Sequence, residues 1–304
     1  MVGNKSILGY ASLAFIFFFL IFSDAAAHSA LNGMTLCAKV LIPTLFPTMV
    51  LTGIAVRSGV LSTLSKIGSK LFPRLFGIDG RYIISFIIGL LGSAPTGAMA
   101  VKNLSDGEDK CNAASALLLS STVSFSFIYT VVGKGLLNNG RRGIALFVFQ
   151  IISVALTAMI MRPKNRKHRK TTMTEGKTEN FPTTVASSIR DASAGMINVC
   201  GSVIFFSAVS GIFISLPISE NVKLFICPFL ELSSGLNYVA GKFPPDIAFV
   251  LASGAVGWSG LAMIFQSVSF AENEIPAHKY ILGRAVSLIL CPILAFISIH
   301  LGII

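Results

Sequence analysis

The stretch Gly89–Ala100, GLLGSAPTGAMA, lies inside an apolar run at residues 82–104 that is long enough to cross a bilayer. Helix from Tyr82 to Leu91 would be about 15 Å long, half of a hydrocarbon core about 30 Å thick. The residues GSAPTG at 92–97 would then interrupt the helix near the midplane, where non-helical backbone must pack against protein or line a polar cavity. The stretch predicts a re-entrant hairpin of two half-helices, with a kink in an ordinary spanning helix as the alternative.

The composition of the whole chain agrees with a membrane location. Of the 304 residues, 53% are hydrophobic and only 12% are charged, and the mean hydropathy is +0.77. A typical soluble domain is about 25% charged. Several apolar runs approach the length of a spanning helix, and none has the alternating pattern of a transmembrane β-strand. We therefore expect an all-α polytopic protein of the cell membrane.

The positive charge is concentrated in two segments between apolar runs. The net charge is +11, and residues 162–190 hold eight basic residues against two acids. Juxtamembrane Lys and Arg favour the cytoplasmic side, so residues 162–190 are predicted to be a cytoplasmic linker and nucleic acid is not an expected partner. A hairpin at 82–104 enters and leaves the membrane on one side, so the linker lies on the same side as the basic segment 57–81. An ordinary spanning helix there would place the two on opposite sides. The run Arg162–Lys170 could also bind anionic membrane lipid.

The remaining chain divides around this linker. Residues 1–30 have the order of a signal peptide but could equally be an uncleaved first transmembrane helix, a signal-anchor. Residues 31–161 form a first repeat and residues 191–304 a second. The five cysteines are scattered at no ligand-like spacing, so neither disulfides, a metal site nor a cofactor is expected. The sequence leaves the oligomeric state open.

Short correspondences connect the two repeats at offsets of 162 to 164 residues. Gly33-Met34 with Cys37 recurs as Gly195-Met196 with Cys200, and Thr96–Met99 recurs within Ser259–Met263. With both basic segments on the cytoplasmic side, the two repeats run in opposite directions across the membrane and are therefore inverted. A second re-entrant hairpin is predicted near 247–270. Paired interrupted segments in inverted halves are typical of the substrate site of a transporter.

Three motifs resemble those of nucleoside-recognition (Gate) domain membrane proteins, most closely the sporulation integral membrane protein YlbJ type. They are Leu41–Pro47, Gly92–Ala98 and Gly257–Gln266, and the resemblance runs from about residue 31 to 303. It implies an inverted-repeat fold with paired hairpins and, for the YlbJ type, transport of dipicolinic acid during sporulation. The sequence departs from the family pattern at Ser120–Ser124 and at Ile264.

Polar residues at membrane depth are the candidates for solute binding, because an isolated polar group there is unfavourable unless it faces protein or water. Helix-break capping, helix packing and interhelical hydrogen bonds are the structural alternatives. Lys39 either pairs with an anionic solute or extends to the interface. The predicted substrate-binding residues are Ser93, Thr96, Gly97, Asn103, Ser120, Ser121, Ser124, Ser259, Gly260 and Gln266.

An enzymatic function is not expected. Gly257–Gly260 matches the nucleophile pattern of rhomboid-type proteases, but the later histidines, His278 and His300, lie in a loop and near the far end of the last helix. No carboxylate inside an apolar run marks a coupling-ion site, since Asp246 lies only at the start of the predicted second hairpin. The sequence predicts a transporter or exporter of a small polar or anionic solute. The alternatives are a nucleoside-type transporter and a non-transporting scaffold or receptor in spore assembly.

Overall fold

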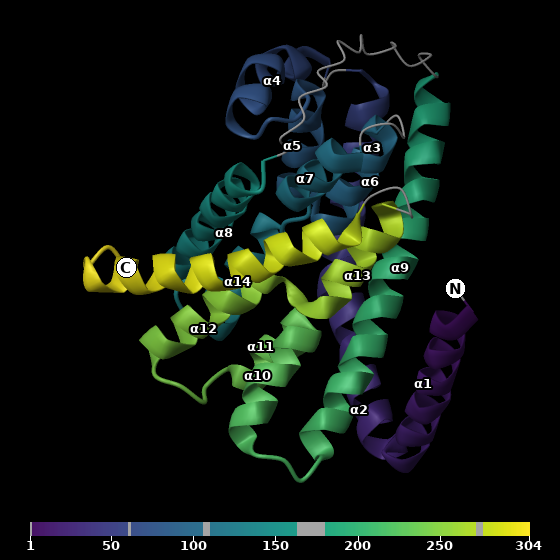
Figure 1. The fold of residues 1–304 in the computed structure, drawn as a ribbon, viewed down its shortest axis with the longest axis vertical. Coiled ribbons are helices and arrows are strands. Elements are labelled where there is room, and N and C mark those ends of the chain that lie inside the picture. The colour runs from purple at the N-terminus through teal and green to yellow at the C-terminus, as the bar shows by residue number, and fades with distance from the viewer. Residues whose placement is uncertain (1, 60–61, 106–109, 163–179, 272–275) are drawn as a thin grey trace.

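The computed structural model describes residues 2–59, 62–105, 110–162, 180–271 and 276–304, and these form helices and no strand (Figure 1). Five helices in the described ranges are long and apolar enough to cross a membrane. They are Ser23–Arg57, Gly140–Ile160, Phe181–Ser215, Pro245–Phe270 and Ala277–His300. The predicted all-α class and multi-pass membrane character are confirmed. Most of the predicted linker, residues 163–179, lies outside the described residues.

Two helices of 35 residues form the longest packed pair. The first joins α2 (Ser23–Leu36), the π-helical turn η1 (Cys37–Leu41) and α3 (Ile42–Arg57), after an N-terminal α1 (Val2–Ile21); the second is α9 (Phe181–Ser215). They run antiparallel, because Gly33 meets Ser207 whereas Gly53 meets Ser188. Small residues at these contacts let the two backbones approach closely.

The two long helices cross where Cys37 contacts Cys200, close enough for the thiols to hydrogen-bond. Mild oxidation of the purified protein is therefore expected to join these two cysteines. A protease site inserted between residues 163 and 179 makes the bond visible: after cleavage, the two halves should migrate together in non-reducing gels and separate with reductant. Cys37→Ser should abolish the bond, and bonding that persists in this variant would contradict the crossing.

The run 82–104 folds back on itself. It contains α5 (Ile83–Gly92) and α6 (Ala94–Leu104), preceded by α4 (Ser62–Leu75) and the short η2 (Gly80–Tyr82). A Cβ built on Gly97 would lie 3.0 Å from the Cα of Gly89, although eight residues of straight helix span about 12 Å. Both glycines also lie against the carbonyl oxygen of Ser120. The chain turns at Ser93, between two antiparallel half-helices.

A second folded-back pair lies in the other half of the chain, at α10 (Glu220–Leu230) and α11 (Leu232–Val239). A Cβ built on Gly235 would lie 2.3 Å from the Cα of Pro228, so these helices also turn back, at Glu231. The open ends are joined at Glu220, which accepts hydrogen bonds from the Tyr238 hydroxyl at 2.8 Å and the Lys242 ammonium at 2.5 Å. The Lys242 and Tyr238 donors lower the pKa of the Glu220 carboxyl.

Each folded-back pair is followed by a helix that is broken but not folded back, and then by a long helix. Their bounds are α7 Lys110–Ser120, η3 Phe127–Leu136, α8 Gly140–Ile160, α12 Pro245–Trp258, α13 Gly260–Ala271 and α14 Ala277–His300.

The backbone between α7 and η3 is held by Gln150, a fully buried residue of α8. Its amide oxygen accepts from the Val123 N–H at 2.9 Å and its amide nitrogen donates to the Val123 carbonyl at 3.0 Å.

The structure corrects three expectations. The hairpin predicted near 247–270 is wrong: α12 and α13 belong to one candidate span of 26 residues, interrupted at Ser259. Its glycines serve close packing instead, since Gly257 meets the Ser287 carbonyl and Gly254 meets Pro292 of α14. Thr96–Met99 therefore lies in a folded-back pair, whereas Ser259–Met263 lies in a broken helix. The expectation that these two stretches occupy equivalent places in the two repeats is also wrong. Finally, the apolar run at residues 113–132, which is long enough for one spanning helix, is broken after Ser120.

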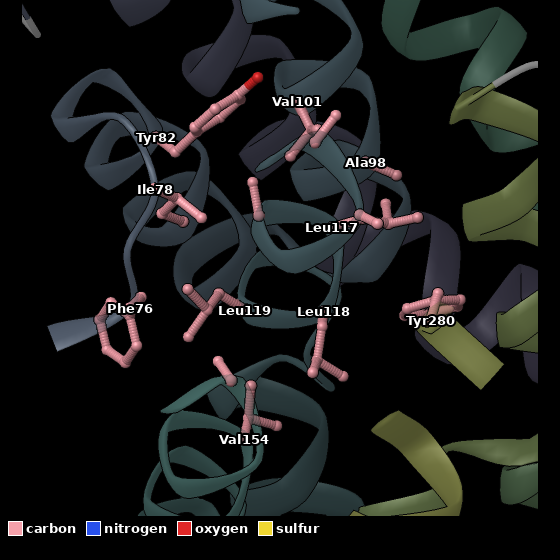
Figure 2. Close-up of a cluster of buried hydrophobic side chains, with 14 of the residues drawn as sticks. Phe76, Ile78, Tyr82, Ala98, Val101, Leu117, Leu118, Leu119, Val154 and Tyr280 are labelled. Carbon is pink, nitrogen blue, oxygen red and sulfur yellow. The ribbon is translucent and has the colours of Figure 1, made fainter. Parts of the chain in front are cut away.

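A buried apolar cluster fixes the first folded-back pair in place. Figure 2 shows side chains of α6, α7, α8 and α14 meeting there, together with residues just before α5. Leu117, Ile78 and Tyr280 are fully buried. A second cluster forms between the long helices and η3, α8, α11 and α12. The breaks at Ser93 and Ser259 are thus held between tightly packed helices rather than on loops.

Candidate functional site

All four helix breaks meet at one cavity of about 40 Å³ between the two long helices. A water molecule occupies about 30 Å³ of liquid, so a cavity of this size holds water rather than a larger solute. A solute of nucleoside size could enter only if the surrounding helices separate. The lining residues are Leu41, Leu45, Ser93, Pro95, Val123, Ser124, Phe127, Val199, Val203, Glu231, Leu232, Ser233, Ser259, Ala262, Met263 and Gln266.

Ser93 forms the first break and has an unusual backbone conformation, with φ of 121° and ψ of 176°. This region of the Ramachandran map is nearly exclusive to glycine, and a serine there costs about 1–3 kcal/mol. The Ser93 hydroxyl is buried and has no hydrogen-bond partner in the described residues. Thr96 donates to the Ser93 carbonyl at 2.7 Å, which closes the first turn of α6. Strain and an unpartnered hydroxyl coincide at the cavity wall.

Glu231 forms the third break and is the only ionisable residue among those that line the cavity in the described part of the chain. It is 3% exposed. Its carboxylate accepts from the Ser233 N–H at 3.0 Å and from the N–H and hydroxyl of Ser234 at 2.6 and 2.7 Å. A carboxylate at a helix N-terminus is stabilised by the helix dipole and by these charge-assisted hydrogen bonds. The cavity wall therefore contains one buried carboxylate whose position is fixed by hydrogen bonds.

The second and fourth breaks add hydroxyl groups. Ser121 and Thr122, next to the cavity-lining Ser124, have buried hydroxyls without a hydrogen-bond partner in the described residues. Ser259 is fully buried and left-handed, with φ of 73°, and its hydroxyl donates to the Val256 carbonyl at 3.0 Å. The cavity wall thus combines serine side chains with a single carboxylate, a composition that suits a solute with hydrogen-bond donors and acceptors.

The structure brings some of the sequence-predicted site residues together at the cavity and leaves others behind its wall. Those that line it are Ser93, Ser124, Ser259 and Gln266. Those that lie outside the lining are Thr96, Gly97, Ser120, Ser121 and Gly260. Gly97 and Gly260 serve close backbone packing, and Ser120 donates to the Ser85 hydroxyl at 2.9 Å. The side chain of Asn103 lies outside the described residues.

Glu231 is the residue that the sequence interpretation missed. It stands alone in an otherwise apolar stretch, three positions after Pro228, and a lone carboxylate in such a stretch is a functional signal. The apolar run around Glu231 is short and weakly hydrophobic, so the sequence alone does not predict that this carboxylate belongs to a site. Its burial adds a carboxylate to the candidate site that the predicted substrate-binding residues did not include.

Two larger cavities flank the central one along the pair of long helices. One of about 560 Å³ includes Lys39 and Ser207 at one end of the pair. The other, of about 310 Å³, includes Thr96, Arg57 and Asp191 at the opposite end, where Arg57 and Asp191 form an ion pair. Lys39 thus lies in the wall of a cavity beside the second folded-back pair. The three cavities follow one line across the molecule.

Metal binding has no support in the described residues, which contain no group of three or more His, Cys, Asp or Glu side chains that could hold an ion. Cys37, Cys200, Cys227 and Cys291 carry free thiols. The chemical content of the site is therefore hydroxyl groups, amides, helix ends and one carboxylate.

Comparison with known proteins gives one partial match to a family model. Residues 38–139 match the Gate family model, described as nucleoside recognition. The match covers about a third of the chain, from η1 to the end of η3, and so includes the first folded-back pair and the first broken helix. No curated protein and no solved structure matches the chain. The match supports a membrane protein related to transport.

Proposed function

We propose that the protein carries a small polar solute across the membrane and binds it in the central cavity. The observation that carries this proposal is the convergence of four helix breaks, with the buried Glu231 and the unpartnered Ser93 hydroxyl, on one point between the long helices. Broken helices at membrane depth expose backbone groups and helix ends for solute binding. The two flanking cavities would serve as the openings of the transport path on the two sides of the membrane.

The fold supports two inverted repeats, each with a re-entrant hairpin. A long helix, a folded-back pair, a broken helix and a final long helix follow one another twice. In this proposal the hairpins are α5–α6 and α10–α11. The antiparallel contact of the two long helices at Cys37 and Cys200, which the sequence repeat also places in register, supports their opposite directions. The end of α3 and the 162–190 linker would then face the cytoplasm.

The chemistry of the cavity favours a solute that donates hydrogen bonds. A sugar hydroxyl or an amino group can donate to Glu231, as a nucleoside would, whereas a dianion such as dipicolinate would meet like charge. The first solute to test is therefore uridine. Dipicolinate, which the resemblance to the YlbJ type implies, is the second. A non-transporting scaffold or receptor is the competing function.

The test measures uptake of radiolabelled uridine and dipicolinate into proteoliposomes that contain the full chain, with Ser93→Gly as the informative variant. Because glycine accepts the backbone conformation at this position and the hydroxyl has no partner, we expect unchanged or higher thermal stability. Losing a solute contact should nevertheless lower uptake by about two- to tenfold, since one hydrogen bond is worth about 0.5–1.5 kcal/mol.

The matched control is Ser298→Ala, which removes a buried hydroxyl of α14 that bonds within its own helix. It should leave uptake unchanged. Saturable uptake that Ser93→Gly lowers and Ser298→Ala does not would support a carrier with its site in this cavity. No uptake of either solute by a folded protein, or equal uptake by Ser93→Gly and the parent, would overturn the proposal and favour a scaffold.

A further inference from the structure

The helix α4 is joined to the first folded-back pair at a steep angle. Its residues Ser65–Leu75 and the following segment Gly80–Gly92 are bent by 110°. If α5 enters the bilayer, as proposed above, α4 must run roughly along the membrane surface. Figure 1 shows α4 at one end of the molecule, beyond α5.

One face of α4 is fixed to the protein. A Cβ built on Gly68 would lie 2.1 Å from the carbonyl oxygen of Gly80. Phe72 is 2% exposed, and its ring lies 6.1 Å from that of Phe86 in α5. Arg162 donates to the Pro73 carbonyl at 3.0 Å. The helix is therefore attached to the outer end of the first folded-back pair and cannot turn about its own axis.

The other faces of α4 are exposed and chemically distinct. At 100° per residue, Ile67 and Leu71 fall on one flank, and they are 58% and 46% exposed. Lys66, Lys70 and Arg74, spaced by four, form a basic stripe beside that flank, and all three are exposed. Their side chains make no ion pair or hydrogen bond with any described residue.

We infer that α4 is an interfacial helix that recognises anionic phospholipid headgroups. Its apolar flank enters the acyl region while the basic stripe lies at the level of the phosphates, the arrangement of an amphipathic helix in a membrane surface. Charge complementarity selects an anionic lipid over a zwitterionic one. Because α4 is attached to α5, this contact anchors the outer end of the first folded-back pair. The inference rests on α5 entering the bilayer and does not depend on transport.

The test places a fluorescent reporter on the apolar flank of the full-length protein. The chain has one tryptophan, Trp258, so Ile67→Trp in a Trp258→Phe background gives a single reporter in vesicles. Lipids with brominated chains quench only a tryptophan that reaches them. Quenching by brominated phosphatidylcholine reports insertion, and stronger quenching by brominated phosphatidylglycerol reports preference for the anionic headgroup. Leu71→Trp is a second reporter on the same flank.

Lys66→Gln with Lys70→Gln should remove most of the preference for phosphatidylglycerol. Each basic residue near an anionic surface contributes about fivefold, so the pair should lower the relative affinity by up to about 30-fold. The matched control is Lys134→Gln with Arg141→Gln, two exposed basic residues on other segments, and it should retain the preference. Glycerol phosphate added in solution should not compete.

Four results would overturn the inference. They are a reporter that no brominated lipid quenches, equal quenching by the two lipids, a preference that survives the Lys66 and Lys70 substitutions, and competition by free glycerol phosphate. The first means that another protein or a second copy covers the flank, and the last means a soluble phosphate site. None of these readouts involves solute uptake, so a failure here is distinguishable from a failure of the proposed carrier.

Discussion

Glu231→Gln is expected to lower solute uptake by about tenfold or more, because a hydrogen bond to a charged group is worth about 1.5–3 kcal/mol. It should also destabilise the protein. The carboxylate accepts three hydrogen bonds from Ser233 and Ser234, and an amide would turn an NH₂ group toward one of these donors. A buried donor left without an acceptor costs about 1–3 kcal/mol. Uptake in proteoliposomes and the thermal midpoint in detergent measure the two effects.

Glu220→Gln is the matched control in the same folded-back pair. Glu220 is exposed and pairs with Lys242 and Tyr238 at the open end of α10–α11, so both uptake and the thermal midpoint should stay close to those of the parent. If Glu231→Gln transports as fast as Glu220→Gln, the carboxylate has no part in solute binding. If it transports slowly at an unchanged midpoint, Glu231 acts on the solute and not through the fold.

Gly97→Ala is expected to prevent the first folded-back pair from closing. The new methyl group would lie 2.1 Å from the Ser120 carbonyl oxygen and 3.0 Å from the Cα of Gly89. Both neighbours are backbone atoms inside a packed cluster, so neither can turn away. Forcing a methyl group into a filled core costs about 1–3 kcal/mol and occasionally more. The expected result is a large fall in thermal midpoint and in the yield of monodisperse protein.

Gly201→Ala in α9 is the opposite case. A Cβ built there meets nothing within 4 Å, and alanine is favoured over glycine inside a helix by about 0.5–1 kcal/mol. The thermal midpoint should therefore rise slightly. If Gly97→Ala and Gly201→Ala have the same midpoint, the close contact of α5 with α6 does not exist in the protein.

The sequence predicts those breaks that glycine and proline cause locally. Gly92 and Pro95 flank the turn at Ser93. Glycine disfavours a helix interior because of its backbone entropy, and proline because it removes a backbone hydrogen bond. The recurrence of Gly33 and Cys37 at Gly195 and Cys200 also has a physical basis, since small residues recur where the two long helices cross. These signals are local or depend on residue size, so a single sequence contains them.

Other features depend on partners that are distant in sequence. The break between α7 and η3 contains neither glycine nor proline, and it exists because Gln150 supplies the hydrogen bonds that Val123 loses. Gly254 and Gly257 look like part of a turn, yet they allow α14 to pack closely. Whether a glycine forms a turn or allows close helix packing depends on the neighbouring helix.

The pairing of Gln150 with Val123 also has a consequence for biosynthesis. A domain is made from its N-terminus at about 5–20 residues per second, so Val123 leaves the ribosome before the amide that will satisfy it. Until α8 has been inserted, the peptide groups around Val123 must bond to water or to the insertion machinery. The first half of the protein consequently matures only once its last helix has arrived, and a chain stalled before that point is a natural substrate for quality-control proteases.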